Sequence, residues 1–194
     1  MNSNKLQVKD LINIGIFTAI YFVVFFLCGM TGYIPFFMLV IPFLCPLASG
    51  IPFMLYLTRV KHFGMITITG FICGVLMLLT GMSWQPVVSG VVFGLLADLI
   101  LKSGRYRSSK RTILAYTVFS VWLMGMMFPL YFARDAYFTQ MIPVYGQEYV
   151  DALLSYTPMW TFYLMAVLSA LGGFIGALLG KATLKKHFQK AGIV

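Results

Sequence analysis

The stretch LINIGIFTAIYFVVFFLCG, residues 11–29, decides the fold class, because it runs for 19 residues without a charged side chain. An α-helix needs about 20 apolar residues to cross the hydrocarbon core of a bilayer. The run is longer than the roughly 7–15 residues of a signal-peptide core, and no A-x-A cleavage pattern follows it. We therefore expect a retained membrane-spanning helix from about Asp10 to Gly29.

The composition of the whole chain extends this interpretation. Of the 194 residues, 60% are hydrophobic and 10% are charged, whereas a soluble domain has about 45–50% apolar and about 25% charged residues. A soluble globule, a disordered chain and a disulfide scaffold are excluded. The sequence predicts one all-α integral membrane domain over residues 1–194, folded as a compact bundle.

Six segments have the length and apolarity of membrane spans. Their approximate ranges are 10–29, 34–57, 63–80, 84–101, 112–132 and 157–180. The second segment contains Pro35, Pro42, Pro46 and Pro52. Because proline removes a backbone donor and clashes with the preceding turn, this helix is not expected to be straight, and its break should face protein or a cavity.

The basic residues indicate the orientation. Every Lys and Arg except Arg134 lies before the first span or on an alternate connection: Lys5, Lys9, Arg59, Lys61, Lys102, Arg105, Arg107, Lys110, Arg111, Lys181, Lys185, Lys186 and Lys190. Such a bias marks the cytoplasmic side. It predicts a multi-pass cell-membrane protein with both termini in the cytoplasm, and it accounts for the net charge of +9 without nucleic-acid binding.

Three connections are then expected on the outer side, at about residues 30–34, 81–83 and 133–156. The last is the longest, and within it Gln147 to Ser155 is predicted to form a short surface helix.

Small residues recur four apart in several spans, a spacing that lets helix backbones approach closely in lipid. The pairs and the triple are Gly15/Ala19, Gly70/Gly74, Gly90/Gly94 and Gly172/Gly176/Gly180. Each serves either packing within the bundle or contact with another membrane subunit. For a partner contact, the best candidates are Gly15, Ala19, Gly172 and Gly176.

Motifs of hydrolases, metal sites and nucleotide-binding loops are missing from the sequence: it contains no HExxH, no GxSxG and no complete P-loop. Both histidines, His62 and His187, fall in basic connections, and Cys28, Cys45 and Cys73 lie in apolar runs without ligand spacing. We expect no enzymatic activity, no cofactor and no bound metal.

The one acidic residue well inside a predicted span is Asp98. Lys102 lies four residues further on, on the same helix face, so an ion pair near the inner membrane surface is the simplest interpretation. Coupling to a partner and proton relay are the alternatives.

Aromatic and polar side chains gather at the outer ends of the predicted helices. They are Tyr33, Trp84, Gln85, Tyr131, Arg134, Asp135, Tyr137, Trp160 and Tyr163. Trp and Tyr favour both membrane surfaces and serve there as anchors. Together with Gln85, Arg134 and Asp135, however, they predict a pocket open to the outside for a small, vitamin-like solute.

The segments KDLINIGIFTAIYFVVFF (residues 9–26), FGLLADLIL (residues 93–101) and GRYRSSKRTILAY (residues 104–116) resemble one group of membrane proteins. They are similar to the MptD-type, or Trep_Strep, members of the substrate-binding S components of energy-coupling factor (ECF) transporters. The resemblance implies a six-helix subunit that binds a solute and works with a membrane T component and two ATP-binding subunits. It also implies that Gly15 and Ala19, at the positions of an Ala-x-x-x-Ala motif, contact the T component, and that transport proceeds by toppling of the subunit in the membrane.

Two other functions fit the sequence less well. A self-sufficient carrier or channel, working as an oligomer, would need ion or proton sites at the membrane midplane and often an inverted repeat, and the two three-helix halves share no pattern. A structural or assembly subunit of a membrane complex is the other alternative. Neighbouring genes for a T component and ATP-binding subunits would favour the transporter.

Overall fold

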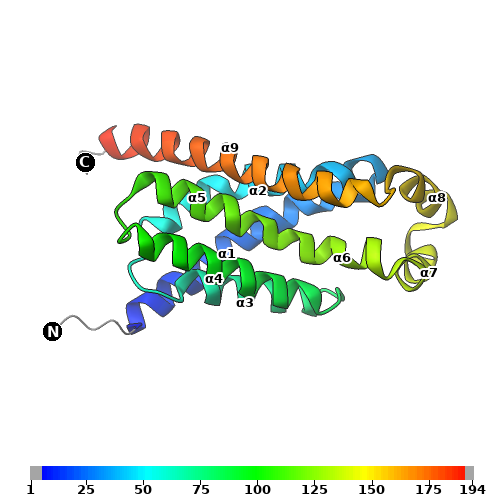
Figure 1. The fold of residues 1–194 in the computed structure, drawn as a ribbon, viewed down its shortest axis with the longest axis horizontal. Coiled ribbons are helices and arrows are strands. Elements are labelled where there is room, and N and C mark those ends of the chain that lie inside the picture. The colour runs from blue at the N-terminus through cyan, green and yellow to red at the C-terminus, as the bar shows by residue number, and fades with distance from the viewer. Residues whose placement is uncertain (1–5, 191–194) are drawn as a thin grey trace.

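The computed structural model describes residues 6–190, with side chains as far as Lys186, and this part of the chain is helical without a β-strand (Figure 1). Lys5 lies outside the described residues, as do the side chains of His187 and Lys190. The elements are α1 (Val8–Gly29), η1 (Met30–Tyr33), α2 (Pro35–Leu57), α3 (Met65–Leu79), α4 (Gln85–Ser103), α5 (Ser109–Ser120), η2 (Val121–Leu123), α6 (Met124–Phe132), α7 (Arg134–Tyr145), α8 (Gln147–Tyr156) and α9 (Trp160–Lys190).

Five helical segments within residues 6–190 are long and apolar enough to cross a membrane. They are Val8–Tyr33, Pro35–Leu57, Gln85–Ser103, Ser109–Phe132 and Trp160–Lys186. These segments match the first, second, fourth, fifth and sixth predicted spans. The segment Ser109–Phe132 is one continuous helical path, in which the 3-10 turn η2 lies between α5 and α6.

Helix α3 is shorter than the predicted third span. It has 15 residues, which at 1.5 Å per residue gives about 22 Å, against about 30 Å for the hydrocarbon core. Gly64 and Gly81 bound the helix with φ angles of +97° and +92°, which L-residues with side chains rarely adopt. The α3–α4 hairpin therefore ends short of α6 at the end of the bundle that carries α7 (Figure 1).

Asp98 forms a cap for α3. Its side chain is fully buried, and its carboxylate accepts hydrogen bonds from the Thr67 hydroxyl at 2.7 Å, the Thr67 N–H at 2.9 Å and the Ile66 N–H at 3.3 Å. The first N–H groups of a helix have no partner within it and attract negative charge. The expected ion pair between Asp98 and Lys102 is therefore wrong, and the Lys102 ammonium lies 5.3 Å from the centre of the Phe63 ring instead.

Glycines mark the closest contacts between helices. Helix α2 packs along α9, and α3 packs along α4. A Cβ added to Gly176 would lie 2.5 Å from the Pro46 carbonyl oxygen, and one added to Gly172 would overlap the backbone of Phe43. These glycines are covered by α2 of the same chain, so the expectation that Gly172 and Gly176 contact another subunit is wrong. Gly70 and Gly90 meet in the same way between α3 and α4.

The prolines of α2 lie within an uninterrupted helix. The expected break in this helix is therefore not found, and Pro42 and Pro46 are buried against protein. The Tyr116 hydroxyl donates to the Pro46 carbonyl at 2.6 Å, and the Ser49 hydroxyl donates to the Cys45 carbonyl at 2.5 Å. The first of these bonds connects α5 to α2 at Pro46.

The 3-10 turn η2 is held by side chains from three neighbouring helices. The indole N–H of Trp122 donates to the Tyr21 hydroxyl at 3.0 Å, and the Ser89 hydroxyl donates to the Trp122 carbonyl at 2.7 Å. Ser120 and Ser169 each donate to the other's carbonyl, at 2.9 and 2.8 Å. Because these bonds join α1, α4 and α9 to η2, they fix the middle of the bundle.

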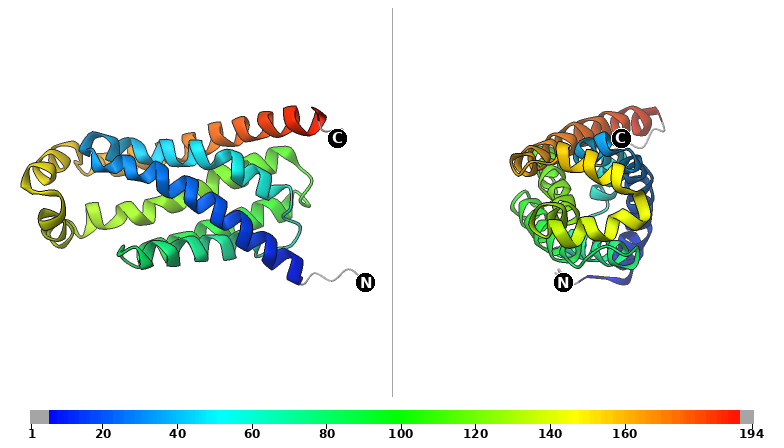
Figure 2. Two further views of the ribbon diagram at one scale, coloured as in Figure 1. Left: turned by 180° about the vertical axis from the view of Figure 1, so that it is seen from behind. Right: turned by 90° about the vertical axis from the view of Figure 1, so that its right-hand side faces the viewer.

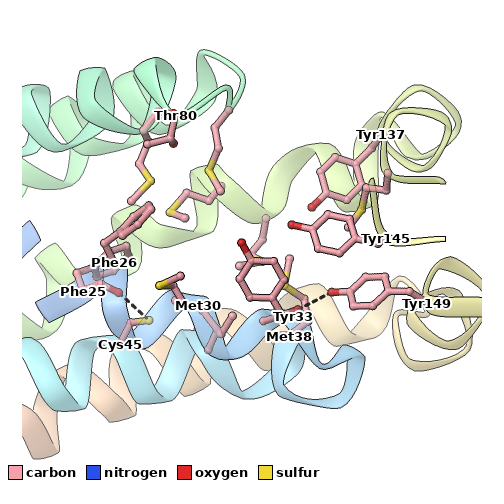
Figure 3. A pocket seen from close by; sticks show the side chains of 18 residues that line it. Phe25, Phe26, Met30, Tyr33, Met38, Cys45, Thr80, Tyr137, Tyr145 and Tyr149 are labelled. Carbon is pink, nitrogen blue, oxygen red and sulfur yellow. Dashed lines mark hydrogen bonds between the residues drawn. The ribbon is translucent and has the colours of Figure 1, made fainter. Parts of the chain in front are cut away.

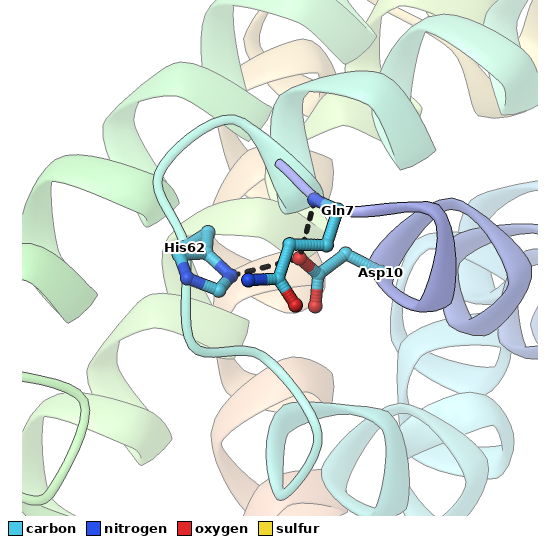
Figure 4. A network of polar contacts seen from close by, with 3 residues as sticks. All are labelled: Gln7, Asp10 and His62. Carbon is cyan, nitrogen blue, oxygen red and sulfur yellow. Dashed lines mark hydrogen bonds and ion pairs between the residues drawn. The ribbon is translucent and has the colours of Figure 1, made fainter. Parts of the chain in front are cut away.

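The start of α1 is attached to the α2–α3 connection (Figure 4). The Asp10 carboxylate accepts from the Gln7 N–H at 2.9 Å and lies 2.9 Å from Nδ1 of His62. Helix α1 begins, and α9 ends, at this end of the bundle, while α7 and α8 lie at the opposite end (Figure 1, Figure 2). We call the first end the basic end, because Arg59, Lys61 and the residues 102–111 with their five Lys and Arg lie on its connections.

A matched pair of substitutions tests the glycine contact. In both positions alanine improves the helix propensity over glycine by about 1 kcal/mol. Gly15→Ala should leave the thermal unfolding temperature unchanged or raise it, because its Cβ meets nothing within 4 Å. Gly176→Ala should lower it, because overpacking costs about 1–3 kcal/mol. Scanning fluorimetry in detergent measures both, and equal temperatures would show that α2 and α9 do not depend on this approach.

Candidate functional site

A cavity of about 230 Å³ lies at the end of the bundle opposite the basic end (Figure 3). The ends of α1 and α3, the turn η1, the start of α2 and the helices α6, α7 and α8 all contribute to its wall. Seven of the lining side chains are methionines: Met30, Met38, Met77, Met82, Met126, Met127 and Met141. Four are tyrosines: Tyr33, Tyr137, Tyr145 and Tyr149.

The tyrosines join the cap formed by α7 and α8 to the rest of the wall. The Tyr149 hydroxyl donates to the Gly32 carbonyl at 2.5 Å, which connects α8 to η1. The rings of Tyr145 and Tyr149 stack with centroids 4.8 Å apart, and Tyr33 lies 5.8 Å from Tyr145 (Figure 3). Burial raises the pKa of Tyr149 to about 12 and also raises the pKa of Tyr145. Both hydroxyls are therefore protonated at neutral pH, and that of Tyr149 is the donor to Gly32.

Packed aromatic side chains close the cavity on the side of the basic end. Phe25 and Cys45 form part of its floor, and the Cys45 thiol donates to the Phe25 carbonyl at 3.6 Å. Beyond them, the ring of Phe25 lies 5.2 Å from Trp122 and 5.7 Å from Tyr21. These side chains are at most 1% exposed, so the cavity ends in the packed core.

A second cavity of about 240 Å³ adjoins the first. It lies between the α3–α4 turn and the helices α6 and α7, and it shares Met82, Met126 and Tyr137 with the first cavity. Gln85 lines it, and the amide oxygen of Gln85 is buried without a hydrogen-bond partner in the described part of the chain. A buried acceptor of this kind costs free energy until a donor reaches it.

Of the residues predicted to line the outer pocket, the structure brings Tyr33, Gln85 and Tyr137 to the two cavities. Trp84, Trp160 and Tyr163 do not line them, because they point outward from the bundle and are 63%, 63% and 67% exposed. For these three the pocket assignment stays a prediction that neither cavity supports. Their position suits the alternative interpretation as anchors at the membrane surface.

Three further predicted pocket residues, Tyr131, Arg134 and Asp135, are also not among the residues that line the two cavities. The Tyr131 hydroxyl is buried against the Thr161 hydroxyl at 2.6 Å. Arg134 donates to the Thr157 carbonyl at 2.7 Å, so its guanidinium holds the start of α7 to the segment before α9. Asp135 is exposed on the outer surface. Tyr131 and Arg134 thus make hydrogen bonds within the chain, and Asp135 is exposed.

Helix α7 and the methionines that line the first cavity were not predicted from the sequence. The helix Gln147–Tyr156 agrees with the predicted surface helix at Gln147–Ser155, but residues 134–145 were expected to be loop and form α7. The methionines gave no separate signal, because Met at helical spacing is equally typical of a packed core. The position of Met82 between two turn residues, Gly81 and Ser83, was the one available indication.

The described residues that line the two cavities carry no ionisable acid or base other than tyrosine and cysteine. None of the described residues that line them is Asp, Glu, Lys, Arg or His. No group of three or more His, Cys, Asp or Glu side chains that could hold a metal ion occurs in the described part of the chain. Apolar walls with a few directed polar groups are typical of sites for small molecules.

The fold defines a multi-pass integral membrane protein with a cavity at one end of its helical bundle. The chain belongs to the Trep_Strep family of hypothetical bacterial integral membrane proteins, whose family model matches residues 8–190. Neither the curated proteins nor the solved structures that were compared with it contain a match.

Gln85 and Arg134 should respond in opposite ways to substitution. Gln85→Leu should raise the thermal unfolding temperature, because an unpaired buried acceptor costs about 1–3 kcal/mol. Arg134→Gln should lower it, because the Thr157 carbonyl loses its donor. Scanning fluorimetry of the two purified variants makes the comparison. A lower temperature for Gln85→Leu would show that this amide has a structural role and is not held free for a solute.

Proposed function

We propose that the chain is the substrate-specific membrane subunit, the S component, of an ECF-type importer. In this role it binds a small solute from outside and delivers it inward together with a T component and two ATP-binding subunits. The observation that carries the proposal is the cavity at one end of the bundle, closed by packed aromatic side chains toward the basic end. Such a cavity holds a solute that arrives from one side only.

The proposed orientation follows from the distribution of charge. Connections rich in Lys and Arg mark the cytoplasmic side, which places the basic end inside and α7 and α8 outside. Both termini are then cytoplasmic, and α3 counts as a sixth, shortened crossing. Its length of about 22 Å can be accommodated by local thinning of the bilayer and by its pairing with α4.

Helix α1 offers the proposed contact surface for the T component. Gly15 and Ala19 lie on its exposed side, and a Cβ on Gly15 would meet nothing of this chain within 4 Å. Apolar neighbours on the same side include Ile12, Ile16 and Val23, each more than half exposed. A helix face with small residues allows close approach of a partner helix in lipid.

The proposed toppling in the membrane requires a body with little exposed charge across its spans. Asp98 is the critical case, because an ionised carboxylate facing lipid costs about 2.5–3.5 kcal/mol or more at mid-membrane. Its three hydrogen bonds with the start of α3 keep it away from lipid. They also occupy its oxygens, which disfavours Asp98 as the ion or proton site that a self-sufficient carrier needs.

Association with partner subunits tests the proposed function. The chain is co-expressed with the T component and the ATP-binding subunits of its own genome and purified through a tag on the T component. Ala19→Trp should reduce the recovered chain at least ten-fold, because the indole prevents close approach of the helices. Val167→Trp is the matched control, since Val167 is exposed to a similar degree on α9 and should have no effect.

Two results would contradict the proposal. One is recovery of the Ala19→Trp variant in the same amount as the unchanged chain. The other is solute uptake by liposomes that contain this chain alone, without ATP.

A further inference from the structure

We infer that the solute is an uncharged aromatic molecule of one or two rings that carries both a hydrogen-bond donor and an acceptor. The inference rests on the proposed function to the extent that it takes the cavity capped by α7 and α8 as the solute site. It is carried by three features of the lining: the lack of ionised groups, the combination of thioethers with aromatic rings, and the free polar atoms at the edge of the two cavities.

The lack of ionised groups excludes a charged solute. Among the described residues that line the two cavities there is no cationic or anionic side chain. Arg134 follows the lining residue Ala133 in the sequence. Its guanidinium contacts the Thr157 carbonyl and the Phe138 ring. An ion moved from water into such a lining would find no counter-charge, and the loss of its hydration would oppose binding.

The thioethers and rings favour an aromatic solute. Methionine is flexible and polarizable, and its sulfur makes favourable contacts with the edges of aromatic rings. Seven methionines surround the first cavity together with Phe25, Phe26 and the tyrosines. Figure 3 shows Met30 and Phe26 on one side of the cavity and Tyr137, Tyr145 and Tyr149 on the other. A flat ring between these groups gains contacts on both faces, whereas an aliphatic polyol would leave them unmatched.

The polar atoms that line the two cavities predict which hydrogen-bonding groups the solute carries. The side chains of Tyr33 and Tyr145 line the first cavity, and their hydroxyls supply donors for an acceptor on the solute. The buried amide oxygen of Gln85, in the adjoining cavity, requires a donor. An amide or lactam group provides both an acceptor and a donor without adding charge.

The volume limits the size of the solute. A cavity of about 230 Å³ lies below the roughly 300–1,000 Å³ of sites for drug-sized ligands. One ring or two fused rings is therefore the expected size. The flexible methionine side chains between the two cavities, Met82 and Met126, can adjust to the outline of the ring.

Three probes with one ring system and different charge test the inference. They are 2-naphthamide, which is neutral, 2-naphthoate, which is anionic, and 2-naphthamidinium, which is cationic. Binding to the purified full chain in lipid nanodiscs is measured by titration calorimetry and by the shift in thermal unfolding temperature. We expect 2-naphthamide to bind at least ten-fold more tightly than either ion. Equal or tighter binding of an ion, or no binding of any probe up to its solubility limit, would overturn the inference.

A pair of tyrosine variants then shows whether the probe occupies the cavity. Tyr145→Phe keeps the ring and removes the hydroxyl, and it should weaken 2-naphthamide binding about five-fold, the usual effect of one lost neutral hydrogen bond. Tyr163→Phe makes the same change at an outward-facing residue that is 67% exposed, and it should leave binding unchanged. Equal effects of both variants would count against this cavity as the binding site.

These outcomes are distinct from those of the partner experiment. Binding is measured on the isolated chain, so failure to recover a T component leaves the preference among the probes intact. A preference for an ion, in turn, would refute the inferred solute class without affecting the association through α1.

Discussion

Direct contact between helix backbones at glycine holds this molecule together. In lipid the helices gain little by burying apolar side chains, so close packing must supply much of the attraction. Between α2 and α9 the contact runs through Gly50, Gly172 and Gly176, and between α3 and α4 through Gly70 and Gly90. These pairs occupy the small-residue faces of α2, α3, α4 and α9, whereas Gly15 and Ala19 of α1 are exposed.

The two ends of the bundle differ in charge and in packing. One end carries basic connections and the Asp10–His62 contact, and the packed rings of Phe25, Tyr21 and Trp122 separate it from the cavity. The other end carries the cavity, whose cap is bonded to η1 through Tyr149. The shortness of α3 matters here, because its turn toward α4 forms a wall of the second cavity instead of filling the space.

Hydropathy and charge predicted most of the fold, because an apolar run of 20 residues has few alternatives in a membrane protein. The predicted third span, residues 63–80, was three residues longer than α3, because hydropathy alone does not locate the ends that Gly64 and Gly81 mark. Of the residues predicted for the outer pocket, Tyr33, Gln85 and Tyr137 line the two cavities. Helix-end aromatics such as Trp84 and Trp160 look alike in sequence whether they face a cavity or lipid, and the rotation of each helix is set by its packing partners. The partner of Asp98 was predicted wrongly for a related reason. Its carboxylate accepts hydrogen bonds from N–H groups of α3, about 30 positions earlier in the sequence.

Cysteine labelling in intact cells tests the orientation of the bundle in the membrane, which is the central claim of the proposed function. Single cysteines are introduced by Glu148→Cys on α8 and by Lys181→Cys on α9, both exposed positions, in a chain whose Cys28, Cys45 and Cys73 are replaced by alanine. The account predicts that a membrane-impermeant maleimide labels the α8 variant in intact cells and the α9 variant only after permeabilisation. Labelling of the α9 variant in intact cells, or protection of the α8 variant, would contradict it.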